Sequence, residues 1–246
     1  MPENDAAELN QRNSYKIVAS IPCFNTEPYI ADIVSATRKY VDQVIVIDDG
    51  SSDTTSESAR KAGACIIHHG RNKGYGEAIK SCFKGARDAN ADILVILDGD
   101  GQHKPDEIPR LIAPILRGEA DLTIGSRFGT ERVDIPPYRR FGIRVITAIF
   151  NLGSRTKVSD AQSGFRAYSR KIFASCTLSE RGMSVSIETL EKARHMGAII
   201  KETPVSCSYT PSRLNLKAVR HGLGVALATA RIRLHSYRRR LPGRKR

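Results

Sequence analysis

The apolar residues of this chain fall into short unbroken runs, separated by longer segments of mixed polarity. A run without polar alternation is typical of a strand that is covered on both faces of a sheet. We expect such strands at Tyr15–Ile21, Gln43–Ile47, Ala64–His68, Asp92–Leu97, Asp121–Gly125 and Ile199–Val205, with a further strand at the end of Ser159–Tyr168.

The segments between these runs place apolar residues at the spacing of a helix face. They predict helices at Pro28–Tyr40, Thr54–Ala62, Gly74–Asn90, Asp106–Leu116, Tyr138–Leu152 and Ser184–Gly197, and a basic helix from Ala218 onward. Strands that alternate with helices form βαβ units. The pattern therefore predicts an α/β fold with a Rossmann-like, mainly parallel central sheet flanked by helices.

Polar clusters follow three of the expected strands, at Pro22–Asn25, Asp48–Ser51 and Asp98–Gln102. In open parallel sheets, ligands bind beyond the carboxyl ends of the strands. We therefore expect these clusters to meet at one site.

The cluster after the fourth expected strand carries Asp98 and Asp100 on one turn. Two carboxylates so close repel each other unless a cation joins them. Gly99 and Gly101 allow a backbone or a phosphate to approach closely, and Gln102 adds a neutral oxygen. This all-oxygen set suits Mg²⁺ or Mn²⁺, which would neutralise a diphosphate leaving group. The alternative is a solvated Asp-Gly turn.

Two other clusters admit more than one interpretation. The carboxylates of Asp48–Asp53 could accept hydrogen bonds from a nucleotide, or Ser52 or Asp53 could cap the next helix. Asn72–Gly76 precedes a helix but lacks the spacing of known phosphate-binding glycine loops, so a helix entry and a ligand contact both remain open.

The net charge of +13 calls for an acidic partner, such as nucleic acid, an anionic membrane or a phosphorylated substrate. The sequence lacks the signatures of RNA- and DNA-binding modules, which argues against nucleic acid. We expect a disordered N-terminus over residues 1–14, one domain over 15–217, and a basic amphipathic helix and tail over 218–246. That helix suits a membrane interface, the alternative being a packed helix with a solvated basic end. No apolar run is long enough to span a bilayer.

Six motifs occur in a fixed order along residues 15–217: IPCFN from Ile21, VIDDGSSDTT from Val46, NKGYGEAIKSCFKGA from Asn72, ILDGDGQHKPDEIP from Ile96, IGSRF from Ile124 and SGFRAYSR from Ser163. The series resembles glycosyltransferase family 2, and within it the polyprenyl-phosphate sugar transferases, which include dolichyl-phosphate mannose and glucose synthases. This resemblance implies a GT-A fold, an inverting mechanism and a UDP- or GDP-sugar donor.

The resemblance also implies roles for single residues. The donor nucleotide and diphosphate would contact Pro22, Phe24, Asp49, Lys73, Asp98 and Gly99. The metal would be held by Asp98, Asp100 and Gln102. The residues expected to act in catalysis, with the arginines contacting phosphates on the acceptor side, are Asp100, Arg127, Arg139 and Arg213. Cys207 stands where the family often has an Arg, and Thr26 where it often has a Glu.

The expected reaction is transfer of a sugar to polyprenyl (dolichyl) phosphate for glycan assembly, such as protein N-glycosylation. A lipid phosphate is largely deprotonated at pH 7 and needs no strong base. The alternative acceptor is a hydroxyl of a lipid-linked or cell-surface polysaccharide, which would need a carboxylate base. Asp160 and Glu188 are the candidates for that base, although Glu188 could equally be a surface acid. We expect peripheral attachment to the cytoplasmic side of a membrane, with a membrane protein as a possible partner.

Overall fold

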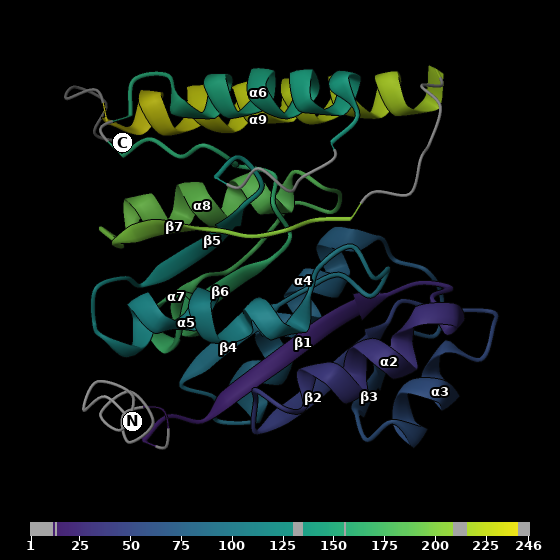
Figure 1. Ribbon diagram of the computed structural model, residues 1–246. Helices are drawn as coiled ribbons and strands as arrows, with labels where there is room; N and C mark the ends of the chain where they lie inside the picture. Colours follow the sequence, from purple (N-terminus) through teal and green to yellow (C-terminus); the bar gives the residue numbers. More distant parts are fainter. Residues whose placement is uncertain (1–11, 13, 130–134, 155, 209–215, 241–246) are drawn as a thin grey trace.

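Seven strands form one sheet in the order β3-β2-β1-β4-β6-β5-β7 in the computed structural model, which describes residues 12, 14–129, 135–154, 156–208 and 216–240 (Figure 1). Neighbouring strands run parallel except on either side of β6, which is antiparallel to β4 and β5. The strands are β1 (Ile17–Cys23), β2 (Gln43–Asp48), β3 (Cys65–His68), β4 (Ile93–Ile96), β5 (Leu122–Ser126), β6 (Arg166–Ser169) and β7 (Ile200–Pro204).

The register brings the carboxyl ends of the central strands to one edge of the sheet. Cys23 at the end of β1 lies opposite Asp48 at the end of β2, and Ser20 lies opposite Ile96 at the end of β4. Every residue of β1, β4 and β5 is buried. The runs of apolar residues in these strands are therefore explained by a sheet that is covered on both faces, as the sequence predicted.

Helices cover the two faces of the sheet. On one face lie α2 (Glu27–Thr37), α3 (Thr55–Lys61) and α5 (Ile108–Leu116), which follows the short 3₁₀ helix η1 (Pro105–Glu107); their core includes Ile17, Ala19 and Ile21 of β1. On the other face, Val18 of β1 belongs to a second core. That core is covered by α4 (Tyr75–Asp88), α7 (Arg170–Ser175) and α8 (Val185–His195).

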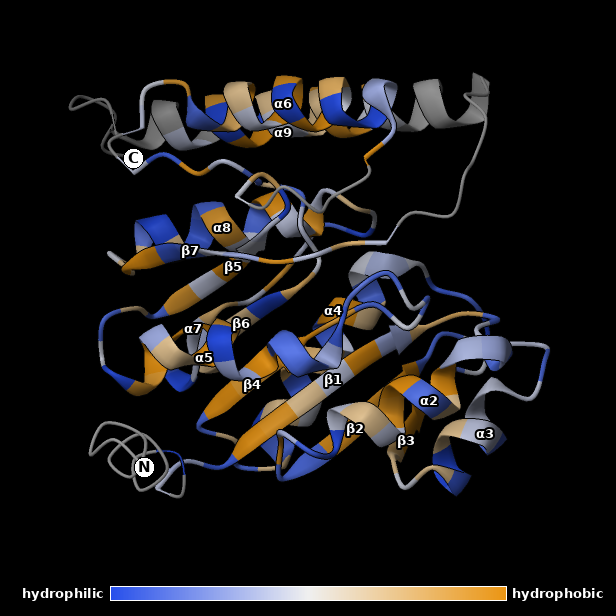
Figure 2. Cartoon of the chain, in the orientation of Figure 1, coloured by the Kyte–Doolittle hydropathy of each residue, from blue (hydrophilic) through white to orange (hydrophobic). Residues whose placement is uncertain are grey.

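Two long helices, α6 (Pro137–Asn151) and α9 (Leu216–Arg240), form a layer outside α8. They contact each other along their lengths, and α9 also contacts α8. Figure 2 shows apolar residues along the strands and on the inner helix faces, with mixed polarity on α6 and α9. In the part of the chain that the structure describes, no helix is both long and apolar enough to cross a membrane.

The expected α/β architecture and its mainly parallel sheet are confirmed. The sequence did not predict α7, and α9 begins at Leu216 rather than at Ala218. Most of the N-terminal segment 1–14, the tail 241–246 and Arg213 lie outside the described residues.

Candidate active site

The acidic turn, residues Asp98–Gln102, follows β4 at the edge where the strands end, and its backbone requires glycine. A Cβ at Gly99 would lie 2.4 Å from the Sγ atom of Cys23, at the end of β1. Gly101 has a φ of +79°, a conformation that glycine adopts without strain. The two glycines therefore seat the turn directly against β1.

Asp98 is held in one orientation by groups from three other segments. The hydroxyl of Tyr75 donates to its Oδ1 atom at 3.2 Å, and Nε2 of His103 lies 3.6 Å from Oδ2. Burial raises the pKa of Asp98, but the contacts with His103 and Tyr75 outweigh burial and lower the pKa below its ordinary value. Gly164 leaves room for this carboxylate, since a Cβ there would lie 2.5 Å from Oδ2. Asp98 is therefore a fixed carboxylate anion.

Asp100 has the opposite electrostatic character. Burial, and then the negative charge of Asp98, raise the pKa of Asp100 above its ordinary value. The side-chain amide of Gln102 donates to its Oδ2 atom at 2.7 Å, and the backbone N–H of Gln102 donates to Oδ1 at 3.1 Å. The structure thus brings Asp98, Asp100 and Gln102 together, and the charge of Asp98 disfavours a second negative charge on Asp100.

Asp49, expected to contact the donor, is 4% exposed and faces the loop that leads into α4. It accepts hydrogen bonds from the backbone N–H groups of Lys73 at 3.0 Å and Gly74 at 2.8 Å, and Nδ1 of His69 lies 2.6 Å away. Asp49 therefore anchors the loop that carries Lys73, and any effect on the donor would pass through that loop.

The N-cap of α3 is Thr54, so neither Ser52 nor Asp53 occupies the capping position that the sequence suggested. Asp53, one residue earlier, binds neighbouring backbone groups instead. Its Oδ1 atom accepts the N–H of Thr55 in the first turn of α3 at 3.0 Å, and its Oδ2 atom accepts the N–H of Glu27 at 3.2 Å. The loop Asn72–Gly76 packs against Arg181, whose carbonyl accepts the N–H of Gly76 at 2.8 Å. Both segments are thus ordered by contacts within the chain.

Two exposed aromatic rings stand beside the acidic turn. Phe24, which follows Pro22 and Cys23 at the end of β1, is 48% exposed, and Tyr29 in α2 is 50% exposed. The ring of Tyr29 would contact a Cβ at Gly101, at 3.5 Å. An exposed ring is suited to stacking on a nucleobase or a sugar. Tyr29 was not identified from the sequence, because an aromatic residue in a helix has the same pattern whether it faces the core or a ligand.

Arg127 makes a bidentate ion pair with Asp160. Its Nε and Nη2 atoms donate to the two carboxylate oxygens at 2.6 and 2.7 Å, and Asp160 is fully buried. The positive charge of Arg127 also contributes to the lowered pKa of Asp98, which places Arg127 within electrostatic range of the acidic turn. Arg139 lies exposed near the start of α6, and Arg213 is outside the described residues.

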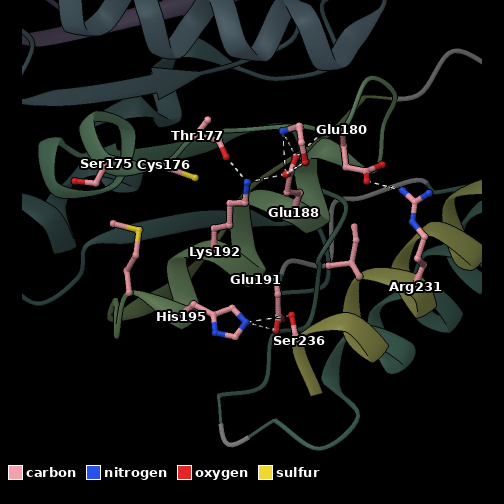
Figure 3. Close-up of a pocket in the computed structure, with 13 residues that line it drawn as sticks. Ser175, Cys176, Thr177, Glu180, Glu188, Glu191, Lys192, His195, Arg231 and Ser236 are labelled. Atoms are coloured by element: carbon pink, nitrogen blue, oxygen red, sulfur yellow. Dashed lines mark hydrogen bonds and ion pairs between the residues drawn. The ribbon is translucent and has the colours of Figure 1, made fainter. Parts of the chain in front are cut away.

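Glu188 is 5% exposed, so its interpretation as a surface acid is wrong. It accepts the backbone N–H groups of Ser179 and Glu180, at 2.9 and 2.8 Å, and pairs with Lys192 at 2.8 Å. Figure 3 shows these groups at the rim of a pocket between α8, α9 and the loop before α8. Its carboxylate is thus committed to that loop, as the carboxylate of Asp160 is committed to Arg127.

Sequence reasoning missed Tyr75, His103 and Gly164, although all three lie within the quoted motifs. Tyr75 begins α4, His103 directly follows the acidic turn, and Gly164 precedes β6. Tyr75 and Gly164 are distant from Asp98 in sequence, and no local spacing indicates their contacts with it; His103 is only five residues away, but its ring had no spacing that marked it as a partner. Only the presence of polar or glycine residues at strand ends could have drawn attention to them.

Comparisons with known proteins agree with this geometry. Residues 19–176 match the model of the family described as glycosyl transferase family 2. The UDP-N-acetylglucosamine–dolichyl-phosphate N-acetylglucosaminyltransferase of Methanococcus voltae is 32% identical over 214 residues, covering 77% of this chain and 84% of that protein. The polyprenol monophosphomannose synthase of Mycolicibacterium smegmatis is 30% identical over 213 residues, covering 79% of this chain and 78% of that protein.

The fold also matches solved structures. Glucosyl-3-phosphoglycerate synthase from Mycobacterium tuberculosis, in complex with uridine diphosphate, superposes with a TM-score of 0.70 at 23% identity, covering 92% of this chain and 83% of that one. This likeness confirms the GT-A fold. The match over residues 19–176 shows that the chain is a glycosyltransferase and belongs to glycosyl transferase family 2.

Proposed function

We propose that this glycosyltransferase moves a sugar from a UDP- or GDP-sugar to polyprenyl (dolichyl) phosphate, with inversion, in a pathway of glycan assembly such as protein N-glycosylation. The observation that carries the proposal is the pair Asp98 and Asp100, held on one turn at the strand ends by contacts with Tyr75, His103 and Gln102. The named relatives that act on dolichyl phosphate or polyprenol support the choice of acceptor.

The acidic turn fits a divalent cation. The described residues contain no cluster of three or more His, Cys, Asp or Glu side chains that could enclose a metal. The oxygen atoms of Asp98, Asp100 and Gln102 are of the kind that Mg²⁺ and Mn²⁺ prefer, and these residues would hold the cation together with the diphosphate. When bound, the cation supplies stabilisation of the charge that develops on the departing diphosphate.

The residues of the chain would position the donor and the acceptor for the transfer. A phosphate oxygen of the acceptor attacks the anomeric carbon in line, while the bond from that carbon to the diphosphate oxygen breaks. The nucleoside diphosphate leaves with the electron pair. Asp160 fixes the guanidinium of Arg127 near the acidic turn, where Arg127, with Arg139 and Arg213, would position the acceptor phosphate. The rings of Phe24 and Tyr29 would border the donor.

The second candidate, transfer to a sugar hydroxyl, requires a general base. The two carboxylates considered for that role, Asp160 and Glu188, are both buried and fully engaged in hydrogen bonds. A phosphate acceptor needs no such base, which favours the first candidate. Because this acceptor is anchored in a bilayer, we further propose that the chain works as a peripheral protein at the cytoplasmic face of a membrane.

The proposal is tested with radiolabelled UDP-N-acetylglucosamine, UDP-glucose and GDP-mannose, each supplied with polyprenyl phosphate and Mn²⁺ or Mg²⁺. One donor is expected to give a labelled product that partitions into organic solvent and depends on both the metal and the lipid. Label appearing only in water-soluble glycan, with polyprenyl phosphate left unused, would overturn the proposed acceptor.

A further inference from the structure

Helix α6 exposes an apolar stripe on the side opposite its buried face. Its buried residues Ile143, Ile146 and Phe150 point into the protein. Phe141 and Val145, at 71% and 38% exposure, lie on the opposite side, and Leu152, the C-cap residue directly after the helix, is 67% exposed. The three follow one another at spacings of four and seven residues. An exposed phenylalanine in line with a valine and a leucine is unusual for a surface that faces only water.

Helix α9 repeats this arrangement. Val225, at 6% exposure, and Thr229, fully buried, face α8 and the core, whereas Leu223, Leu227 and Leu234 are each at least 61% exposed. Leu223, Leu227 and Leu234 show the same spacing of four and seven residues, on the side opposite Val225 and Thr229. Helices α6 and α9 lie against each other in one outer layer (Figure 1). We call their two exposed apolar stripes together the outer face.

Ion pairs fix the orientation of α9. Nη2 of Arg231 donates to Glu180 at 2.5 Å, and Nη1 of Arg233 donates to Glu191 at 2.8 Å. Ser236, 7% exposed, lies 3.0 Å from Nε2 of His195. These contacts, several of them visible in Figure 3, direct the two arginines in the middle of α9 toward the body of the protein. These ion pairs keep the outer face turned away from the protein body. Arg231 and Arg233 therefore do not contribute the positive charge near the outer face.

The charge near the outer face indicates whether a second copy of the chain or a membrane binds there. Arg140 and Arg144 are exposed on α6, the sequence of α9 contains no acidic residue, and the chain carries a net charge of +13. A second copy would bring two like-charged faces together, which is unfavourable. An anionic bilayer surface matches both properties, since its headgroups attract the flanking arginines and its acyl boundary accepts the apolar stripe.

The outer face is also connected to the candidate active site. Ile143 on the inner side of α6 packs with Ile135, Cys207 and Phe128, the residue that follows Arg127. The segment after β7 continues from Cys207 to Ser208, whose N–H donates to the carbonyl of Gln102 at 3.0 Å. A short chain of contacts thus joins the outer face to the acidic turn.

We propose that α6 and α9 together form the membrane-binding surface of this protein, inserting Phe141, Val145, Leu152, Leu223, Leu227 and Leu234 into an anionic lipid interface. This proposal rests on the proposed function, in which the acceptor is anchored in a bilayer, and it names the surface that would contact that bilayer. It differs from attachment by a basic tail alone, because Phe141 and Val145 belong to α6 and Leu152 directly follows it, far from the tail in sequence.

The test is flotation of the full chain with vesicles of phosphatidylcholine and phosphatidylglycerol. The double variant Phe141→Ser/Leu227→Ser, with one substitution on each helix, is expected to lower vesicle binding about tenfold or more. Ile199→Ser is the matched control, because Ile199 is 54% exposed but lies outside both helices, and its binding should equal that of the wild type. Circular dichroism verifies that both variants are folded.

Equal binding of the double variant and the wild type would overturn the proposal. So would a wild-type dimer that dissociates in the double variant, which would assign the outer face to a second copy. A separate assay uses a short, water-soluble polyprenyl phosphate, on which the double variant should match the wild type. If neither protein transfers sugar to this acceptor, the proposed function fails while the vesicle result still decides the role of the outer face.

Discussion

At the scale of single residues, the candidate site depends on the space that surrounds Asp98. Gly164 lies in the segment before β6, far from Asp98 in sequence, yet it has no side chain because the carboxylate occupies that place. The hydroxyl of Tyr75 and the ring of His103 approach the same carboxylate from other directions. The position of Asp98 is therefore set by three segments, and its own turn is only one part of its support.

Gly164→Ala is expected to lower turnover roughly 100-fold, because the new Cβ would displace Asp98 from its position by a large fraction of an ångström. The backbone at Gly164 is not in the left-handed region, so the substitution should leave the fold intact. Turnover is measured in the radiolabel assay beside Gly182→Ala, a control at a glycine with no neighbour within 4 Å. Equal turnover in the two variants would show that Asp98 tolerates the displacement.

The sequence predicted the surroundings of some site residues correctly and those of others not at all. Asp98, Asp100 and Gln102 could be predicted together because they are neighbours on one turn after a buried strand. The inward orientation of Asp49 could not, since its partners are the backbone of Lys73 and Gly74. Local spacing reports which residues share a turn, whereas it carries no information about which distant backbone group a carboxylate will satisfy.

At the scale of elements, the strands could be predicted because burial on both faces leaves an unbroken apolar run. The reversed direction of β6 leaves no such mark, since a buried strand has the same composition in either direction. The helix α7, Arg170–Ser175, is too short for its periodicity to be distinguished from a loop. Element type thus followed from the sequence, while strand order and direction required the packing of the whole sheet.

Glu188 shows how one helix fixes the loop before it. Its buried carboxylate accepts the N–H groups of Ser179 and Glu180 and pairs with Lys192. Although burial raises the pKa of Glu188, the contacts with Lys192 and Ser179 outweigh it, and the pKa lies below its ordinary value. The carboxylate therefore stabilises the native state at neutral pH. This contribution declines as the pH falls below the unfolded value near 4.5 and is lost as the pH passes the lowered native value.

Glu188→Gln is accordingly expected to destabilise the protein by about 2 kcal/mol at pH 7, because hydrogen bonds to a charged acceptor are replaced by weaker ones. The free energy of unfolding is measured with urea at pH 7 and at pH 4. The difference between variant and wild type should shrink at the lower pH. Glu57→Gln, at an exposed position of α3, should change the stability little at either pH. A difference that stays constant with pH would contradict the role of the charge.

At the scale of the whole molecule, the candidate active site and the outer face lie on different layers of the fold. The acidic turn, Phe24 and Tyr29 lie where β1 and β4 end, and the outer face of α6 and α9 lies on a separate layer. The segment after β7 connects them through Ser208 and Gln102. A donor that reaches the site from solution and an acceptor that stays in a bilayer would thus approach from different sides.

This arrangement predicts that metal and nucleotide stabilise the protein jointly. A diphosphate placed beside Asp98 and Asp100 without a cation would add negative charge where the pKa of Asp100 is already raised. Mn²⁺ held by Asp98 and Asp100 would offset the charge of the carboxylates, so that binding of the nucleotide would favour the native state. At a concentration of 100 times Kd, the expected gain is about 2.7 kcal/mol, or a rise in Tm of roughly 5–10 °C.

Thermal unfolding with UDP or GDP, each with Mn²⁺ or with a chelator, measures this coupling and identifies the preferred base at the same time. One nucleotide should raise Tm strongly with Mn²⁺ and only weakly with the chelator. Asp100→Asn should lose most of the joint effect, whereas Asp106→Asn, an exposed neighbour of the turn, should keep it. If the preferred nucleotide stabilises the protein equally with the chelator, the acidic turn does not act through a cation, and the diphosphate must be held by the basic groups near Arg127 instead.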